Sequence, residues 1–433
     1  MLLFKLAGLV ALASSVAAQL DDHEAWPFDV TTISSPDGSV TAKFVSLGAT
    51  VVELYVKDRD GQSLDVVPSY DDPSRLLTDS GHPVFNAIVG RYANRIKNGQ
   101  LPHNASRNPG SLLTLLFVRT GRFTVPPTRN PPANGPGVYH IPTNAGPNTL
   151  HGGTLGWDRR NWTIVDKNAT SVTYHHLDTA DEGFPGYVDA YVTHSVDNGQ
   201  LRSQVHATAS AQTPIMVTQH MYWNLDGFRT STSDWNTANI LDHTLYLDSS
   251  RYLQMDADGI PTGDILSVAG TPLDFRAPTT IGARFDQAKG VSGHYVLIVN
   301  GLGLIDIVCT DCQGYDNCWI YDKPEEQTQG VSLWSDFSGI RLDITTNMPA
   351  TQVYTSNGLS VPRKAVHGGP SLSYGSHSAV AIEQQGWVDA INNPQWGVDQ
   401  IYGPGKDFAW STTYRFSNFA KGAHLSILSS EHE

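Results

Sequence analysis

The side chains best suited to chemistry are a histidine and a glutamate, each set inside an apolar segment. His220 lies within TQHMYWNL at residues 218–225, and Glu383 follows the apolar run AVAI at residues 379–382. Burial shifts the pKa of such groups, as general acid–base catalysis requires. A buried acid costs free energy unless it is hydrogen-bonded or paired, so Glu383 is either a structural ion or a positioned base.

Three further polar clusters lie among turn residues, where binding groups are commonly placed. Asn94 and Arg95 follow a glycine in GRYANRI, and a rigid guanidinium suits hydroxyls or carboxylates, although a turn with a salt bridge is the plainer interpretation. His151 stands beside two glycines, and a lone histidine is more often structural or solvated than catalytic. Asp274 is two residues from Arg276, so these two side chains either pair with each other or bind a ligand.

Composition and missing motifs narrow the chemistry. The 433 residues include 28 Lys+Arg and 42 Asp+Glu, for a net charge of −14, and 40% of them are hydrophobic. That apolar fraction excludes a disordered chain, and the acidic balance makes nucleic acid and membrane surfaces poor partners. The sequence holds no GxSxG nucleophile elbow, no HExxH zinc motif and no GxxxxGK phosphate loop. A neutral polar small molecule fits best.

The elements that must position these residues are β-strands. Short segments rich in Val, Ile, Thr and Tyr recur along the chain, separated by Gly, Asn, Asp and Pro, and 39 Gly and 25 Pro leave little room for long helices. The pattern predicts an all-β fold, a large antiparallel β-sandwich. Expected strands include residues 40–45, 50–55, 163–165, 171–175, 190–196, 201–207, 244–247, 295–299, 304–309 and 331–334.

The first residues predict export. Residues 1–18 combine a lone lysine, an apolar stretch too short to span a bilayer and small residues before a cleavage site, as in a secretory signal peptide. Sequons at Asn104, Asn161 and Asn168 agree with a secreted, glycosylated protein. We therefore expect a signal peptide at residues 1–18 and a single domain at residues 19–433, located outside the cell.

Three cysteines, Cys309, Cys312 and Cys318, lie within ten residues of one another. In an oxidising compartment we expect two of them to pair and one to remain free. Without a nearby histidine they make a poor tetrahedral zinc site, so we expect no metal.

Residues 101–136 do not fit the pattern of strands and turns. They contain the apolar run LLTLLF and then a proline-rich segment, which makes them an atypical insertion. They either form a surface excursion with an edge strand or are foreign to the fold. We hypothesise that residues 101–122 are a translated intron or another gene-model artefact, which a transcript containing the stretch would refute.

Taken together and in order, the clusters resemble the aldose 1-epimerase (galactose mutarotase) family. The resemblance implies a β-supersandwich with an open sugar cleft, no cofactor and no metal, and interconversion of the α and β anomers of a free aldohexose such as galactose or glucose. It is carried by GRYANRI (90–96), NTLHGG (148–153), TQHMYWNL (218–225), IPTG (260–263), TPLDF (271–275), GYD (314–316), QVY (352–354) and AIEQQ (381–385).

By position, the resemblance implies that Glu383 is the base that takes the anomeric proton and that His220 is the acid that protonates the ring oxygen. It further implies that sugar hydroxyls are held by Asn94, Arg95, His151 and Asp274.

The chain departs from the family pattern at one place close to the site, and other functions are also possible on the same residues. The family's GYDHN becomes GYD followed by Asn317 and Cys318, so we expect a cleft-facing imidazole to be missing. A non-catalytic sugar-binding protein on the same fold would bind sugar without accelerating mutarotation. A glycoside hydrolase needs two carboxylates, for which Asp274 and Glu383 are the candidates. A hexose-6-phosphate mutarotase would need cations for the phosphate. We expect a monomer.

Overall fold

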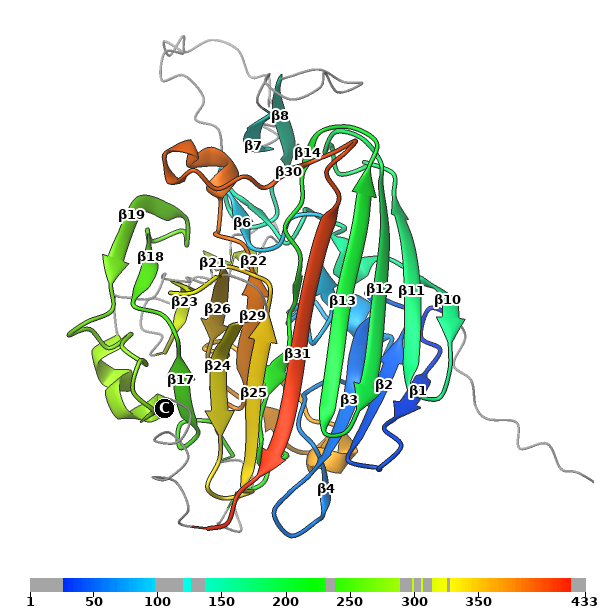
Figure 1. The fold of residues 1–433 in the computed structure, drawn as a ribbon, viewed down its shortest axis with the longest axis vertical. Helices are drawn as coiled ribbons and strands as arrows, with labels where there is room; N and C mark the ends of the chain where they lie inside the picture. Colours follow the sequence, from blue (N-terminus) through cyan, green and yellow to red (C-terminus); the bar gives the residue numbers. More distant parts are fainter. Residues whose placement is uncertain are drawn as a thin grey trace, which may run out of the picture.

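The computed structural model describes residues 26–97, 120–125, 137–230, 238–288, 298–299, 305–306, 314–324 and 328–421. The predicted signal peptide at residues 1–18, the sequon at Asn104 and the cysteines Cys309 and Cys312 lie outside the described residues. Of the insertion at residues 101–136, only strand β7 (Thr120–Val125) is described, and it pairs antiparallel with β8 (Gly137–Pro142). This hairpin stands out at the top of the molecule in Figure 1.

The largest layer is a nine-stranded antiparallel sheet whose long strands run side by side through the molecule (Figure 1). The C-terminal strand lies in its middle, between strands from earlier in the chain. In order across the sheet the strands are β10 (Thr163–Lys167), β11 (Ser171–Asp178), β12 (Val188–Asp197), β13 (Gln200–Ala209), β31 (Phe408–Asn418), β25 (Ile340–Thr346), β24 (Thr328–Trp334), β17 (Thr244–Leu247) and β20 (Thr279–Thr280).

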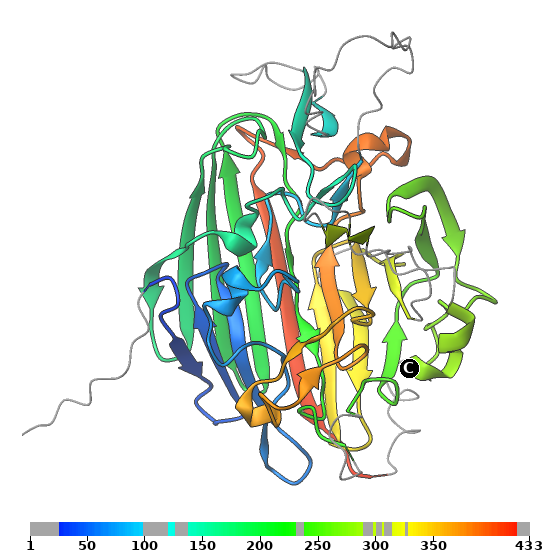
Figure 2. The same ribbon diagram turned by 180° about the vertical axis from the view of Figure 1, so that it is seen from behind.

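Two smaller antiparallel sheets cover one face of this layer. From behind, the four-stranded sheet lies in front of strands β11 to β13 (Figure 2). It consists of β1 (Thr31–Ser34), β2 (Val40–Val45), β3 (Thr50–Lys57) and β4 (Ser63–Asp65). The six-stranded sheet has the order β16 (Tyr222–Trp223), β29 (Val380–Gln385), β26 (Ala350–Tyr354), β23 (Asp316–Ile320), β18 (Arg251–Met255) and β19 (Pro261–Ser267).

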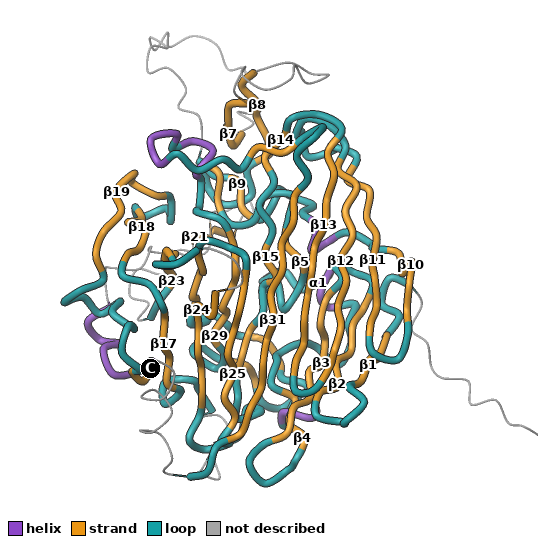
Figure 3. Tube along the Cα trace, viewed as in Figure 1, coloured by secondary structure: helices purple, strands orange, loops and turns teal. Residues whose placement is uncertain are grey.

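The remaining described elements are short, and Figure 3 shows how little of the chain is helical. Among the described residues, no helix is long and apolar enough to cross a membrane. The short strand pairs are β5 (Ile88–Val89) with β15 (Thr218–Gln219), β6 (Arg95–Ile96) with β9 (Thr149–Leu150), β14 (Thr213–Pro214) with β30 (Ile401–Tyr402), β21 (Ile298–Val299) with β22 (Ile305–Asp306), and β27 (Val361–Pro362) with β28 (Ser373–Tyr374). The helices are α1 (Arg75–Thr78), η1 (Trp157–Arg159), η3 (Ile281–Ala288), η4 (Ala365–His367), η5 (Ala390–Asn392) and η6 (Pro394–Trp396).

The period-two pattern of the long strands explains the sandwich. Along β13 and β25 buried residues alternate with less buried ones, so each strand presents one apolar face to the interior. One continuous core cluster joins Phe44 of the four-stranded sheet, Val205 and Trp410 of the nine-stranded sheet, and Ile382 of the six-stranded sheet. The predicted large antiparallel β-sandwich is confirmed.

Hydrogen bonds across the core fix strand β29 against the nine-stranded sheet. The Trp410 indole donates to the Gln384 carbonyl at 2.8 Å, and the Tyr321 hydroxyl donates to the Gln384 side chain at 2.6 Å. Because side chains alternate along a strand, these contacts on Gln384 turn its neighbour Glu383 to the opposite face. The sheet therefore presents Glu383 away from the core.

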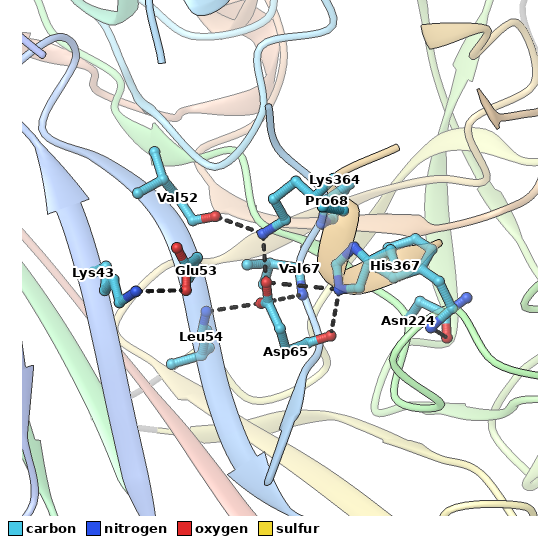
Figure 4. A network of polar contacts seen from close by, with 12 residues as sticks. Lys43, Val52, Glu53, Leu54, Asp65, Val67, Pro68, Asn224, Lys364 and His367 are labelled. Atoms are coloured by element: carbon cyan, nitrogen blue, oxygen red, sulfur yellow. Dashed lines mark hydrogen bonds and ion pairs between the residues drawn. The ribbon is translucent and has the colours of Figure 1, made fainter. Parts of the chain in front are cut away.

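A buried polar cluster ties the four-stranded sheet to the segment around η4 (Figure 4). The Lys364 ammonium donates to the Val52 carbonyl at 2.7 Å and to the Asp65 carboxylate at 2.5 Å. The His367 Nε2–H donates to the Asp65 carbonyl at 2.9 Å, and the Tyr374 hydroxyl donates to His367 Nδ1 at 2.6 Å. The cluster fixes the segment that leads into and out of β27 and β28.

Candidate active site

A cleft of about 880 Å³ lies beside the six-stranded sheet. This volume is in the upper part of the range of roughly 300–1,000 Å³ that is typical of small-molecule sites. Five of the six residues predicted to form the site line this cleft together: Asn94, Arg95, His151, His220 and Glu383.

The register of the six-stranded sheet places a row of polar side chains on its cleft face. Glu383 on β29 lies directly opposite Gln352 on β26, and Asp316 on β23 lies opposite Tyr354 on β26. Positions 352 and 354 are two apart, as a shared face requires. All four residues line the cleft, together with Tyr222 on the neighbouring strand β16.

His220 and Glu383 are in direct contact. His220 Nε2 lies 3.3 Å from Glu383 Oε1, and both side chains are buried. The imidazole of His220 stacks on the Tyr222 ring at a centroid distance of 5.0 Å and meets the His151 ring edge-on at 5.3 Å. Packed between two rings, His220 is held in one orientation against the carboxyl group.

Burial dominates the charge state of this pair. It raises the pKa of Glu383 well above its usual value, and the nearby carboxylate of Asp316 raises it further. Burial also lowers the pKa of His220 to about 4. Burial therefore favours the neutral form of both groups, in which the carboxyl group of Glu383 carries a proton and the imidazole of His220 carries no charge.

The same residues leave hydrogen-bonding capacity unused. Among the described residues, no partner is found for Glu383 Oε2, His220 Nδ1 or Gln352 Oε1, although all three atoms are buried. A buried polar atom without a partner costs free energy, so several of them around one cleft indicate a ligand rich in hydroxyl groups.

Two hydrogen bonds join Asn94 and His151. The His151 amide donates to the Asn94 carbonyl at 3.0 Å, and the Asn94 amide donates to His151 Nδ1 at 3.2 Å. Because Nδ1 accepts this bond, the neutral ring carries its proton on Nε2. Burial lowers the pKa of His151 well below its usual value, with added repulsion from His220 and Arg95. His151 therefore acts as a neutral Nε2–H donor.

Close backbone packing positions the loop that carries His151. A side chain at Gly152 would place its Cβ 2.2 Å from the Gly90 carbonyl oxygen, and one at Gly90 would strike the Trp157 ring. The Trp157 indole donates to Asp178 at 2.8 Å, and the buried Arg91 guanidinium binds the same carboxylate. The glycines of the two predicted motifs thus let the segments touch.

Arg95 and Gln352 act on the cleft carboxylates. Gln352 Nε2 donates to Asp316 Oδ1 at 2.6 Å. Burial raises the pKa of Asp316, while the positive charge of Arg95 and the bond from Gln352 oppose that rise. Arg95 also opposes the rise in the pKa of Glu383. This end of the cleft therefore combines two acids with one compensating cation.

The prediction that Asp274 binds the sugar requires correction, because Asp274 does not line the cleft. Its carboxylate accepts two hydrogen bonds from Arg276, at 2.8 and 2.7 Å, which is the pairing that the sequence left open. Its backbone carbonyl accepts a bond from Arg284. The glycoside hydrolase interpretation needed Asp274 and Glu383 in the same site, and only Glu383 lines the cleft.

A second correction concerns position 317. Asn317 on β23 pairs with Val353 on β26, which is next to Ile382 on β29, and these two neighbours belong to the core. Residue 317 therefore faces away from the cleft, and the missing imidazole leaves no gap in the site.

Sequence reasoning missed Asp316, Gln352 and Tyr354 as site residues, although it quoted the motifs that contain them. The signal that could have found them is the period of two, which places them on the face of Glu383 once β23, β26 and β29 are paired.

Among the described residues, no group of three or more His, Cys, Asp or Glu side chains could hold a metal ion. Cys318 is a buried free thiol on β23, and burial raises its pKa to about 12.

Comparison with known proteins gives a consistent result. A family model described as "Aldose 1-epimerase" matches residues 29–109 and 121–415, which leaves residues 110–120, inside the predicted insertion, unmatched. A probable aldose 1-epimerase of Arthroderma benhamiae is 33% identical, with 89% of this chain and 86% of that protein covered. Galactose mutarotase of Rattus norvegicus is 31% identical, with coverage of 86% and 90%.

Solved structures agree. A GalM/aldose epimerase homologue from C. elegans superposes with a TM-score of 0.69 at 25% identity, covering 90% of this chain and 99% of that one. A galactose 1-epimerase from Lactobacillus acidophilus shares the fold, with a TM-score of 0.63 at 19% identity and coverage of 92% and 97%.

Proposed function

We propose that this chain, which belongs to the aldose 1-epimerase family and is an isomerase that interconverts the α and β anomers of an aldose, does so with Glu383 as general base and His220 as general acid. The observation that carries these roles is the 3.3 Å contact between Glu383 Oε1 and His220 Nε2 inside the cleft. The anomeric oxygen O1 and the ring oxygen O5 of a pyranose are bonded to the same carbon. Two side chains in contact with each other can therefore reach both oxygens.

The reaction needs one proton removed and one delivered, and the pair holds one proton in total. With Glu383 ionised and His220 protonated, the carboxylate takes the proton of O1–H while the imidazolium protonates O5, and the C1–O5 bond breaks. The open-chain aldehyde then faces a protonated Glu383 and a neutral His220, the charge state that burial of the pair favours. Rotation about C1–C2 and the reverse transfers close the other anomer and restore the starting state.

The surrounding groups orient the ring. The carbon next to C1, on the side away from O5, is C2, so the 2- and 3-hydroxyls lie on the Glu383 side, beside Asp316, Gln352 and Arg95. On the other side, His151 offers its Nε2–H near O5, next to His220. The buried acceptor atoms Glu383 Oε2 and Gln352 Oε1, without partners among the described residues, are suited to receive sugar hydroxyls.

We propose a free aldohexose, galactose or glucose, as the substrate. At the Glu383 end, two acids and the single arginine Arg95 line the cleft, and this shortage of cations favours an uncharged ring over a sugar phosphate at that end.

We further propose that the protein is secreted and acts as a monomer. The secretory pattern of residues 1–18 and the sequons at Asn161 and Asn168 support export. Detection in culture medium and light scattering after gel filtration test these two points.

Polarimetry of freshly dissolved α-D-galactose and α-D-glucose tests the residue roles and the substrate. We expect the purified protein to accelerate the approach to rotational equilibrium at neutral pH, and Glu383→Gln to remove most of that acceleration. Saturable sugar binding without any acceleration would contradict the proposal and indicate the non-catalytic alternative.

A further inference from the structure

The cleft continues past His220 to a group of side chains that the reaction does not use. His82, Asp158 and Arg159 line this end, contributed by the loop after α1 and by η1. His82 Nε2 lies 2.7 Å from Asp158 Oδ2 and 3.0 Å from Arg159 Nε. The three side chains thus form one connected cluster within the wall of the cleft.

Arg159 is the uncommitted member of this cluster. Apart from the contact of Nε with His82, no hydrogen bond or ion pair of the Arg159 guanidinium is found among the described residues. The Arg159 side chain is half-buried and lines the cleft. By contrast, its neighbour Arg160 pairs with Asp181 at 2.8 Å. A guanidinium facing a cleft without an acidic partner is unusual in a chain with a net charge of −14.

The two acids at this end of the cleft have partners of their own. Asp158 contacts His82, and Asp79 accepts hydrogen bonds from Arg75 at 3.0 Å and from the Gly81 amide at 2.8 Å. Neither carboxylate forms an ion pair with Arg159 among the described residues. The guanidinium is therefore the free charge that an incoming group meets here.

The orientation of the sugar, which rests on the proposed function, indicates which part of the sugar meets the Arg159 guanidinium. The charges of Asp158 and His82 act on His220, while those of Asp316 and Arg95 act on Glu383, so the two sets lie at opposite ends of the catalytic pair. With O1 at Glu383 and O5 at His220, the atom that follows O5 around the ring is C5. Its exocyclic substituent, C6, then points towards His82, Asp158 and Arg159.

We propose that Arg159, supported by His82, forms a subsite for a carboxylate at C6, so that the enzyme also interconverts the anomers of aldohexuronates such as D-galacturonate. A guanidinium presents a planar fork of N–H donors that matches a carboxylate in two hydrogen bonds. One arginine balances the single charge of a carboxylate, whereas a phosphate would call for further cations. The chemistry at C1 and O5 is the same as for a neutral aldose.

A series of sugars that differ only at C6 tests the subsite. L-Arabinose, D-galactose and D-galacturonate share their configuration at the other ring carbons and carry, respectively, no C6, a hydroxymethyl group and a carboxylate. We expect Arg159→Gln to raise KM for D-galacturonate by about tenfold or more beyond any change for D-galactose. Arg159→Lys, which keeps the charge but loses the fork, should give an intermediate ratio.

A matched control and a salt titration isolate the charge. Arg276→Gln removes one positive charge at the Asp274 pair, outside the cleft, and should leave the ratio of the two KM values unchanged. In the wild-type enzyme, added salt should raise KM for D-galacturonate and not for D-galactose, because an ion pair at the cleft wall is screened.

Calorimetric titration of D-galacturonate into wild-type protein and Arg159→Gln separates the subsite from the proposed function. Uronate binding that depends on Arg159 in a protein that accelerates no sugar would support the subsite and overturn the catalytic proposal. Acceleration of D-galactose with no Arg159-dependent binding or turnover of D-galacturonate would overturn the subsite alone. Equal effects of Arg159→Gln on both sugars would also overturn it.

Discussion

Two buried acid–base pairs in the described part of the chain differ in how completely their polar atoms are satisfied. Asp65 and Lys364 join the four-stranded sheet to the segment around η4 (Figure 4), and Glu383 and His220 meet in the cleft. Each pair brings together residues far apart in the sequence, and each is almost completely buried. Burial raises the pKa of both acids.

The Asp65 pair is saturated. Its carboxylate accepts from Lys364 and from the Leu54 amide at 2.9 Å, its ammonium also donates to Val52, and neighbouring His367 has both ring nitrogens bonded. The Glu383 pair has one contact at 3.3 Å and leaves atoms on both partners without a bond among the described residues. Both pairs are buried and both acids have a raised pKa. What distinguishes the reacting pair from the structural one is that some of its hydrogen-bonding atoms face a cleft and have no partner among the described residues.

The largest expected effect is the loss of turnover when either residue of the Glu383–His220 pair is replaced. Glu383→Gln and His220→Asn should each lower kcat/KM for mutarotation by about 10²–10⁴-fold, because each removes one of the two proton transfers. Polarimetry with purified variants measures the loss.

Stability provides the control for these variants. Glu383→Gln removes an acid that is hard to bury, so its melting temperature should equal or exceed that of the wild type. Full activity in either variant, or a loss that only follows unfolding, would contradict the assigned roles.

The Asp65 pair should respond in the opposite way. Lys364→Met keeps an unbranched side chain but leaves Asp65 buried without its cation, and we expect a loss of about 3–5 kcal/mol in the free energy of unfolding. The folded variant should retain near wild-type kcat/KM. Denaturant unfolding and polarimetry on the same sample give both quantities.

A surface pair supplies the matched comparison. Lys43 and Glu53 lie 2.9 Å apart with partly exposed side chains, and Lys43→Met should cost less than about 1 kcal/mol. The double variant Asp65→Asn with Lys364→Met should recover part of the loss. Equal costs at Lys43 and Lys364 would show that Asp65 does not need its partner.

Most of the fold could be predicted because its signal is local. Residues 40–45 and 244–247 coincide with β2 and β17, and the other predicted strands that the structure describes fall within observed ones or overlap them. Which strands are neighbours is not local information. The C-terminal β31 pairs with β13 and β25, and no pattern within residues 408–418 indicates those partners.

The site could be predicted in part for the same reason. His220 and Glu383 stand out because a titratable residue within an apolar run is unusual at the level of sequence. Asp316 does not, since its place depends on the register of β23 against β26. Asp274 seemed equivalent, with a carboxylate in a glycine-bounded turn, and only the tertiary structure shows that it pairs locally with Arg276.

This contrast between two aspartates gives a prediction of intermediate size. Asp316→Asn removes a carboxylate acceptor from the cleft and, if the proposed orientation of the sugar holds, should raise KM by about 10–100-fold. Asp274→Asn alters a surface pair and should leave kcat and KM within about twofold of the wild type. Saturation kinetics with D-galactose on both variants would reverse this assignment if only Asp274→Asn were impaired.

The smallest expected effect concerns acidity. Because the pKa of His220 is about 4 in the folded chain, kcat/KM should hold steady down to about pH 5. It should then fall below pH 4, where His220 takes up a second proton while Glu383 is still protonated and cannot act as a base. An acid limb near pH 6.5, the ordinary histidine value, would mean that burial does not govern this group.

Unfolding measured over the same pH range separates lost chemistry from lost structure. The unfolded chain protonates His220 below about pH 6.5, and the folded chain does so only near pH 4. Between these values the unfolded state binds more protons, so the free energy of unfolding falls as the pH decreases, by about 1.4 kcal/mol per pH unit for this residue. His220→Asn should flatten that slope, whereas Glu383→Gln should steepen it, because the raised pKa of Glu383 makes the folded chain bind the extra proton at this group and so opposes the slope. A slope identical in the wild type and in His220→Asn would place the imidazole in water and remove the basis for a shared, buried proton.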